Sequence, residues 1–238
     1  PEYKLAISTD ARGTIKVWHG ESGQELAAFS TSSSSSSLVA YSVNNKPFLT
    51  VTIAGGVICT LEVPNLNQVS CITAFQNSSI DLLLCSPDEQ WLVYICLYFS
   101  LHQIFYTDCL INPADESPVS GSLPVNNCAV GCWLPKAPAR IAVMHQDHMS
   151  VQRNITVFDL AVKNGQKVIS RDPHGDHSLQ PLLTWTTPIL MKGHGTETIL
   201  LACGSNLELY SIFGTQLEAF QHHNNTITSI WVVCLSTV

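Results

Sequence analysis

The chain has 238 residues, of which 45% are hydrophobic and 12% are charged, and its formal net charge at pH 7 is −7. This balance indicates a folded domain with a core and excludes a disordered tail. The acidic charge argues against nucleic acid and against an anionic membrane surface as partners. The most apolar stretch, Trp91 to Phe105, is interrupted by polar residues and is too short to span a membrane as a helix.

The nine cysteines include no CxxC pair, and several of them lie inside apolar runs. Cys128 and Cys132 are too far apart along a strand to form a disulfide with each other. We therefore expect buried free thiols in a reducing compartment, and a cytoplasmic or nuclear location.

A phenylalanine recurs at the end of three similar segments, ELAAF, CITAF and LEAF, at Phe29, Phe75 and Phe220. The first two lie roughly 46 residues apart, and the third follows after about three such periods. The residues between them form short strand-like runs separated by turn residues, and no segment has a helical period. A strand-only repeat of this length is typical of a β-propeller, in which four-stranded antiparallel blades bury their faces against one another.

Taken in chain order, these runs predict an all-β propeller segment of about five blades of four antiparallel strands, with an incomplete ring in this chain. The third blade is expected to include a strand at Gln103–Leu110, the fifth a strand at Leu182–Leu190, and Thr226–Cys234 is expected to open a sixth blade. The serine-rich Thr31–Ser37 is expected to be a solvated loop, with phosphorylation as the alternative. The predicted blades span residues 1–30, 38–76, 80–123, 127–170 and 180–221, with the start of the next at 226–238.

The segment Gly13–Trp18, followed by Glu21–Glu25, resembles the third-strand signature of a WD40 repeat. At the equivalent later positions only Asp108 and Asp159 keep the aspartate of that family, and Arg12 stands where the family often has a turn aspartate. The Gly–His dipeptide that precedes each regular repeat is also absent. The resemblance therefore implies that the His–Ser/Thr–Trp–Asp hydrogen-bond network of WD40 blades is largely missing, and that apolar packing mainly holds the blades.

Four segments in the same order and spacing resemble F-box/WD-repeat proteins: Thr14–Trp18, Thr73–Phe75, Cys85–Asp88 and Cys128–Lys136. In that family an F-box binds the Skp1–cullin part of a ubiquitin ligase, and the propeller, usually of about seven blades, recruits the protein to be ubiquitinated. No F-box is visible in these residues. The resemblance thus implies a non-catalytic substrate-recognition propeller here, and adaptor binding by a longer parent protein.

One face of the predicted propeller gathers basic residues. Arg12 and Arg153 are expected in loops that join second and third strands, and Arg171, with His174 and His177, in a loop that joins two blades. Both kinds of loop emerge on the same face, whereas Arg140 maps to the opposite one. Because arginine binds carboxylates and phosphates through a bidentate fork, this face is a candidate for docking an acidic or phosphorylated protein segment. The alternative is that polar loop residues coincide there by chance.

Other chemistry has weaker support. The His-rich segments 145–148 and 174–177 contain residue types that bind zinc, but their spacing matches no established zinc pattern, so we expect no metal and no cofactor. No nucleophile elbow, phosphate-binding glycine loop or HExxH motif occurs, so we expect no enzyme. Two alternatives to the ubiquitin-ligase receptor remain open. One is a WD40 scaffold in an unrelated complex, and the other is an extracellular propeller glycosylated at Asn77, Asn154 or Asn224.

Overall fold

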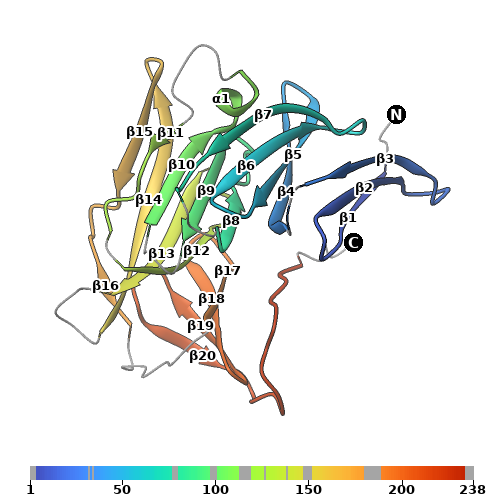
Figure 1. Cartoon of the computed structure of the whole chain (residues 1–238). Helices are drawn as coiled ribbons and strands as arrows, with labels where there is room; N and C mark the ends of the chain where they lie inside the picture. The colour runs from blue at the N-terminus through green and yellow to red at the C-terminus, as the bar shows by residue number, and fades with distance from the viewer. Residues whose placement is uncertain are drawn as a thin grey trace, which may run out of the picture. The chain divides into compact units, whose positions relative to one another are not determined.

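The computed structural model of the chain (Figure 1) describes residues 4–31, 33, 35–76, 80–96, 101–112, 119–125, 127–137, 139–146, 152–179 and 189–233. Within these residues it contains five antiparallel sheets, which follow one another along the chain, and one single-turn helix. The chain divides into two compact units, one of Pro1–Cys85 with Glu89–Ser122, the other of Ser86–Asp88 with Leu123–Val238. The predicted all-β, propeller-type class with blades of about four strands is confirmed.

The first unit holds three sheets, in each of which neighbouring strands are also consecutive in the sequence. This arrangement follows from short turns such as the one between β4 and β5, where Asn44 and Asn45 both have positive φ, as a two-residue hairpin turn requires. The first sheet is β1 (Leu5–Thr9), β2 (Thr14–His19) and β3 (Glu25–Ser30). The second is β4 (Ser35–Val43), β5 (Lys46–Ile53), β6 (Val57–Glu62) and β7 (Asn67–Thr73). The third is β8 (Leu82–Cys85), β9 (Trp91–Cys96), β10 (Leu101–Tyr106) and β11 (Val119–Gly121).

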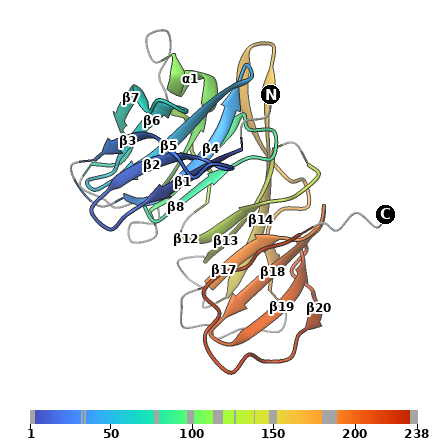
Figure 2. The same ribbon diagram turned by 90° about the vertical axis from the view of Figure 1, so that its right-hand side faces the viewer.

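The second sheet is buried on both faces, between the first sheet and the third (Figure 2). Successive side chains of a strand point to opposite faces, so β6 contributes Leu61 to one core and Ile58 to the other. One core joins the first and second sheets through Ile15, Val17, Leu49, Val51, Leu61, Val63 and Leu66. The other joins the second and third sheets through residues that include Tyr41, Phe48, Phe75, Leu92, Tyr94 and Phe105. Burial of both faces explains why successive residues of β5 and β6 are buried, instead of every second one.

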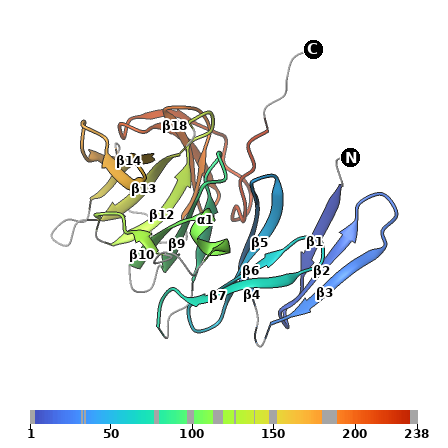
Figure 3. The same cartoon turned by 90° about the horizontal axis from the view of Figure 1, so that it is seen from above.

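The second unit holds two sheets (Figure 3). The fourth sheet has the order β12 (Cys128–Trp133), β13 (Arg140–Gln146), β14 (Arg153–Lys163) and β15 (Gln166–Arg171), and the short β16 (His177–Ser178) also pairs with β14. The fifth sheet is β17 (Ile189–Gly193), β18 (Thr198–Cys203), β19 (Asn206–Ser211) and β20 (Gln216–Ala219). β12 and β17 approach each other closely. A Cβ at Gly193 of β17 would lie only 2.2 Å from the carbonyl oxygen of Trp133 on β12. Glycine at this position therefore permits the contact between the two sheets.

One predicted strand is shorter than expected, and another is absent from the described residues. The expected strand at Gln103–Leu110 ends at Tyr106, and Thr107–Ile111 forms the single-turn helix α1, which buries Cys109 and Leu110. A short apolar run is compatible with either a strand or a helix, so the sequence did not show that the strand ends before Thr107. The described part of Thr226–Cys234, up to Val233, forms no strand, and Trp231 is 81% exposed. The Ile227 amide donates a 2.7 Å hydrogen bond to the Gly204 carbonyl, but the described part of this segment forms no ladder of such bonds and is therefore not a strand.

One other segment differs from expectation, and a further one is largely untested. The serine-rich segment is not entirely loop, because Ser35–Ser37 begin β4 and Thr52 Oγ1 accepts a hydrogen bond of 2.8 Å from the Ser37 amide. Most of the expected strand at Leu182–Leu190 lies outside the described residues, and β17 begins only at Ile189.

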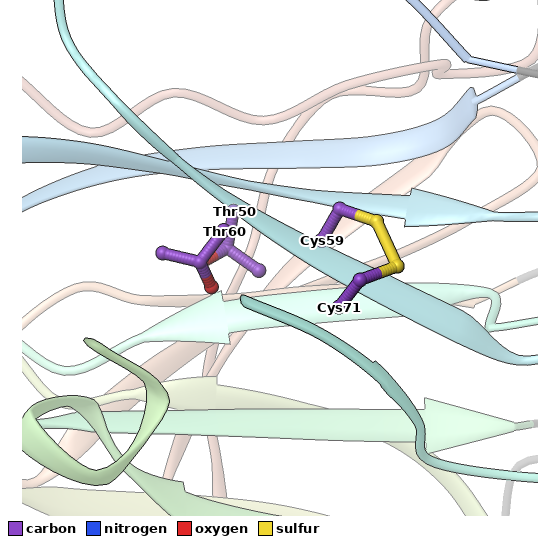
Figure 4. Close-up of a disulfide and its surroundings, with 4 residues drawn as sticks. All are labelled: Thr50, Cys59, Thr60 and Cys71. Carbon is purple, nitrogen blue, oxygen red and sulfur yellow. A yellow bond between two sulfur atoms is a disulfide. The ribbon is translucent and has the colours of Figure 1, made fainter. Parts of the chain in front are cut away.

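The structure joins Cys59 and Cys71 in a disulfide, so the expectation of free thiols is wrong for this pair (Figure 4). The two cysteines are directly opposite each other on β6 and β7, with their Cα atoms 4.2 Å apart. The sequence analysis missed the pair because its partners are close only when the hairpin register is known. The other described cysteines form no disulfide: Cys85, Cys96, Cys109, Cys128, Cys132 and Cys203.

The first sheet keeps more of the WD40 hydrogen-bond network than expected. Trp18 Nε1 donates a 2.9 Å hydrogen bond to Ser8 Oγ on the neighbouring strand. Asp10, not Arg12, has the role of the turn aspartate, since Asp10 Oδ1 accepts hydrogen bonds from the amides of Arg12 and Thr14. The hydrogen bond from Thr14 also lowers the pKa of the Asp10 carboxyl. The first sheet thus retains the tryptophan–serine hydrogen bond and a turn aspartate of that network, while the loss of its histidine link stays a prediction.

The second sheet also contains a buried polar ladder. The hydroxyls of Tyr41 and Thr50 lie 2.9 Å apart, and those of Thr50 and Thr60 lie 3.2 Å apart. All three residues are buried, so each hydroxyl replaces hydrogen bonds to water with bonds to a neighbouring strand. Polar contacts thus supplement the apolar packing between these strands.

Candidate functional site

The candidate site is a polar pocket of about 200 Å³ in the second unit. It lies where β13 ends, β14 begins and the chain turns after β15. His145 and Gln146 come from β13, Asn154 from β14, and Arg171 from β15. The pocket is lined by Pro124, Val125, His145, Gln146, Asn154, Arg171 and Asp176.

A hydrogen-bonded chain of four side chains forms one wall of this pocket. Asp176 Oδ1 accepts hydrogen bonds from the guanidinium of Arg171 and from the hydroxyl of Thr156. The imidazole Nε2 of His145 lies 2.7 Å from the same hydroxyl oxygen and 3.5 Å from Asp176 Oδ1. Because a hydroxyl has only one proton and Thr156 gives it to the carboxylate, His145 Nε2 carries a proton and donates to Thr156.

The electrostatics of the wall favour an ionised Asp176. Burial alone would raise the pKa of its carboxyl, but the hydrogen bonds from Arg171 and Thr156 and the charge of Arg171 lower the pKa below its usual value. In the unliganded protein the positive charge of Arg171 is therefore compensated by Asp176. An anionic ligand at this wall competes with Asp176 for the guanidinium.

The structure brings four of the five predicted site residues together along one edge of β14. Asn154 and Ile155 pair with Ser178 and His177, and the carbonyl of Arg153 accepts a hydrogen bond from the amide of Leu179. Arg171 lies further along the same edge, opposite Phe158. His174 lies in the turn between them, where its amide donates to the Asp172 carboxylate. Arg153, Arg171, His174 and His177 thus share one side of the fourth sheet.

Two positions differ from the prediction. Both arginines were expected in loops, but Arg153 is the first residue of β14 and Arg171 is the last residue of β15. The strands extend to these residues because backbone pairing continues beyond the apolar runs. Burial lowers the pKa of the Arg153 guanidinium. Arg12 lies in the turn between β1 and β2 in the first unit, so its presence on the same face as the others stays a prediction.

Arg140 begins β13, at the opposite end of the strand from Gln146, which pairs with Arg153, so its predicted place on the other face is not contradicted. Its guanidinium forms ion pairs with Asp172, which directly follows Arg171, and with Asp159 at 3.3 Å. The ladder explains this, since Arg140 pairs with Asp159 on one edge of β14 while Arg171 pairs with the adjacent Phe158 on the other. No sequence signal indicated the Arg140–Asp172 contact, which joins residues 32 positions apart.

His174 and His177 have a common neighbour that the sequence analysis did not identify. The ring of Phe213, which is 40% exposed, meets their imidazoles edge to face at centroid distances of 5.9 and 5.2 Å. A Cβ at Gly214 would lie 2.3 Å from the carbonyl oxygen of Ser178, so the turn that carries Phe213 packs tightly on β16. The two histidines therefore contact an apolar ring and do not converge on the pocket.

Among the residues that the structure describes, no group of three or more His, Cys, Asp or Glu side chains is placed to hold a metal ion. Asp147 and His148 of the first His-rich segment lie outside the described residues. In the second segment, Asp176 is engaged by Arg171. Within the described ranges, no helix has the length and hydropathy that a membrane span requires.

Comparison with solved structures supports the architecture. The chain superposes on a protein of unknown function from Desulfotomaculum acetoxidans DSM 771 with a TM-score of 0.66 and 12% identity, over 92% of this chain and 67% of that one. It superposes on the C-terminal WD40 domain of Sif2 with a TM-score of 0.63 and 10% identity, over 94% of this chain and 59% of that one. These similarities show the fold alone: the chain is a segment of the WD40 propeller type.

Comparison of sequences identifies relatives. No family model matches the chain. It is 37% identical over 237 residues to human F-box/WD repeat-containing protein 12, covering 98% of this chain and 50% of that protein. It is 22% identical to mouse F-box/WD repeat-containing protein 15, again over 98% of this chain and 50% of that protein. The chain thus spans about half the length of these relatives, and its resemblance to the WD40-repeat portion of F-box/WD-repeat proteins is confirmed.

Proposed function

We propose that this chain is the substrate-recognition propeller of a Skp1–cullin–F-box ubiquitin ligase. The observation that carries the proposal is the 37% identity to F-box/WD repeat-containing protein 12 along almost the whole chain. The propeller has no catalytic step of its own in this proposal. It holds a target protein near the ubiquitin-conjugating enzyme, in the cytoplasm or the nucleus, while an F-box elsewhere in the full-length protein binds Skp1.

The docking surface in this proposal is the basic edge of the fourth sheet, made by Arg153, Arg171, His174 and His177. Arg12 of the first unit stays a separate candidate contact. An acidic or phosphorylated segment of the target binds there, because guanidinium groups pair with carboxylate and phosphate oxygens in a fixed fork. The pocket beside Arg171 supports this assignment, as it offers further donors from Gln146 and Asn154. The Arg171–Asp176 ion pair gives the surface selectivity, since only a ligand of sufficient negative charge displaces the carboxylate.

The first experiment tests the ligase role in the natural full-length protein. The tagged protein is purified from cytosol by affinity, and its co-purifying proteins are identified by mass spectrometry. Skp1 and a cullin are expected among them, together with candidate targets. A stable complex that lacks both would contradict the ligase role and support the alternative, a WD40 scaffold unrelated to ubiquitination.

The second experiment tests the docking surface. Joint replacement of Arg12, Arg153 and Arg171 by alanine is expected to remove the candidate targets from the purified complex while Skp1 remains. Lys163→Ala, which removes an exposed cation from the β14–β15 hairpin, serves as the matched control and should change neither. The docking assignment is wrong if the triple variant retains its targets.

A further inference from the structure

Cys71 differs from the other cysteines in its exposure. Among the eight cysteines that the structure describes, Cys71 alone is exposed to solvent. Its disulfide partner Cys59 is only 2% exposed. Cys85 and Cys203 are half-buried, and the remaining cysteines are buried. A reagent in solution therefore reaches one end of the disulfide and not the other.

The bond lies at an edge of the second sheet. β7 is its outermost strand, and the cysteines are one of six residue pairs that join β7 to β6. On its inner side Cys59 lies opposite Val51, a fully buried residue of β5. Figure 4 shows the sulfurs bridging the two strands apart from the Thr50–Thr60 pair. The five other β6–β7 pairs do not depend on the bond, so the sheet can keep its pairing when the bond opens.

We propose that Cys59–Cys71 is a reversible thiol-exchange site, which opens at Cys71 and accepts a low-molecular-weight thiol of the glutathione class. A thiolate attacks Cys71 Sγ from solvent, and the Cys59–Cys71 bond breaks as the new bond to Cys71 forms. Cys59 Sγ leaves with the electron pair and takes up a proton. A second thiol then attacks the sulfur of the attached group, which releases Cys71 as a thiol and the small molecule as its disulfide. The protein disulfide is thereby reduced by two electrons and two small thiols are oxidised.

A reversible bond reconciles the Cys59–Cys71 disulfide with the reducing compartment that the sequence leads us to expect. In a reducing compartment the dithiol form dominates, and oxidation of the thiol pool closes the bond or leaves the adduct on Cys71. Cys128 and Cys132 do not compete, because burial raises the pKa of their thiols to about 12 and leaves almost no thiolate. Modification is therefore directed to the outer strand of the second sheet.

The test uses the purified chain in glutathione buffers that range from fully oxidised to fully reduced. Each sample is quenched with N-ethylmaleimide, and its peptides are identified by mass spectrometry. A linked Cys59–Cys71 peptide is expected at the oxidised end, a glutathione adduct on Cys71 at intermediate ratios, and an alkylated Cys71 with an unlinked Cys59 at the reduced end. The proposal is overturned if the linked peptide never forms, if it persists at every ratio, or if Cys85 and Cys203 take up glutathione as readily as Cys71.

Three variants keep the result interpretable. Cys203→Ser removes a half-buried thiol of the second unit and should leave the titration unchanged. Cys59→Ser should still take up glutathione at Cys71, whereas Cys71→Ser should give no adduct at Cys59. Maleimide labelling of Cys128 and Cys132 reports unfolding in the same samples, so an adduct that appears only together with this labelling also contradicts the proposal.

Discussion

Replacement of Leu61 by alanine tests whether the sheets are held together by their facing apolar cores. Leu61 is fully buried in the cluster that joins the first and second sheets. The substitution removes three carbon groups from that cluster, which costs about 2.5 kcal/mol in lost burial. The cavity that remains raises the expected loss of unfolding free energy to about 3–5 kcal/mol. For a chain of this size the melting temperature should fall by roughly 10 °C.

The assay is urea unfolding followed by circular dichroism, with Leu217→Ala as the matched control. Leu217 is 51% exposed on β20, so its replacement should change the free energy of unfolding by less than about 0.5 kcal/mol. The pair Leu61→Ala and Val17→Ala adds a sharper test, because these residues belong to different sheets of one cluster. Their effects should be non-additive by about 0.5 kcal/mol or more. Full additivity together with a loss below about 1 kcal/mol for Leu61→Ala would refute the packing of these two sheets.

Three further predictions concern polar groups and thiols. Ser8→Ala should cost about 1 kcal/mol of unfolding free energy by removing the acceptor of Trp18 Nε1, and an unchanged urea midpoint would show that this bond contributes nothing. Because the folded pKa of Asp176 lies below its unfolded value, its stabilisation is complete above the unfolded pKa of about 3.8 and is lost as pH falls through the folded value. Asp176→Asn should therefore flatten the acid limb of the stability–pH curve, and an unaltered limb would contradict the Arg171–Asp176 pair. At pH 8 the thiols of Cys128 and Cys132, with pKa values of about 12, should be ionised in only about one molecule in 10⁴. Maleimide should label them only after unfolding, which labelling of the native protein would disprove.

The candidate site was only partly visible in the sequence. Arg171 was selected because it lies in a polar connection after an apolar run, and it does line the pocket. His145 and Asp176 were weighed only as metal ligands, although both lie on the hydrogen-bonded wall of that pocket. Their roles depend on the pairing of β13, β14 and β15, which places residues from three strands within hydrogen-bonding distance. Local composition contains no information about that register.

The periodic phenylalanines show where local pattern stops being informative. Their spacing predicted the repeat correctly, yet Phe75 is buried between the second and third sheets while Phe220 is 43% exposed. The same local segment has different surroundings because burial depends on whether another sheet covers that face.

By itself the sequence determined the strand-only repeat, the tight turns and the WD40 class. These follow from hydrophobic period and turn residues, which act over a few positions along the chain. Only the tertiary structure decided the Cys59–Cys71 bond, the Arg140–Asp172 ion pair and the exposure of Trp231. Each of these depends on which strands pair, in which register, and on which faces are covered. Contacts between residues far apart in the chain are therefore set by the assembled sheets.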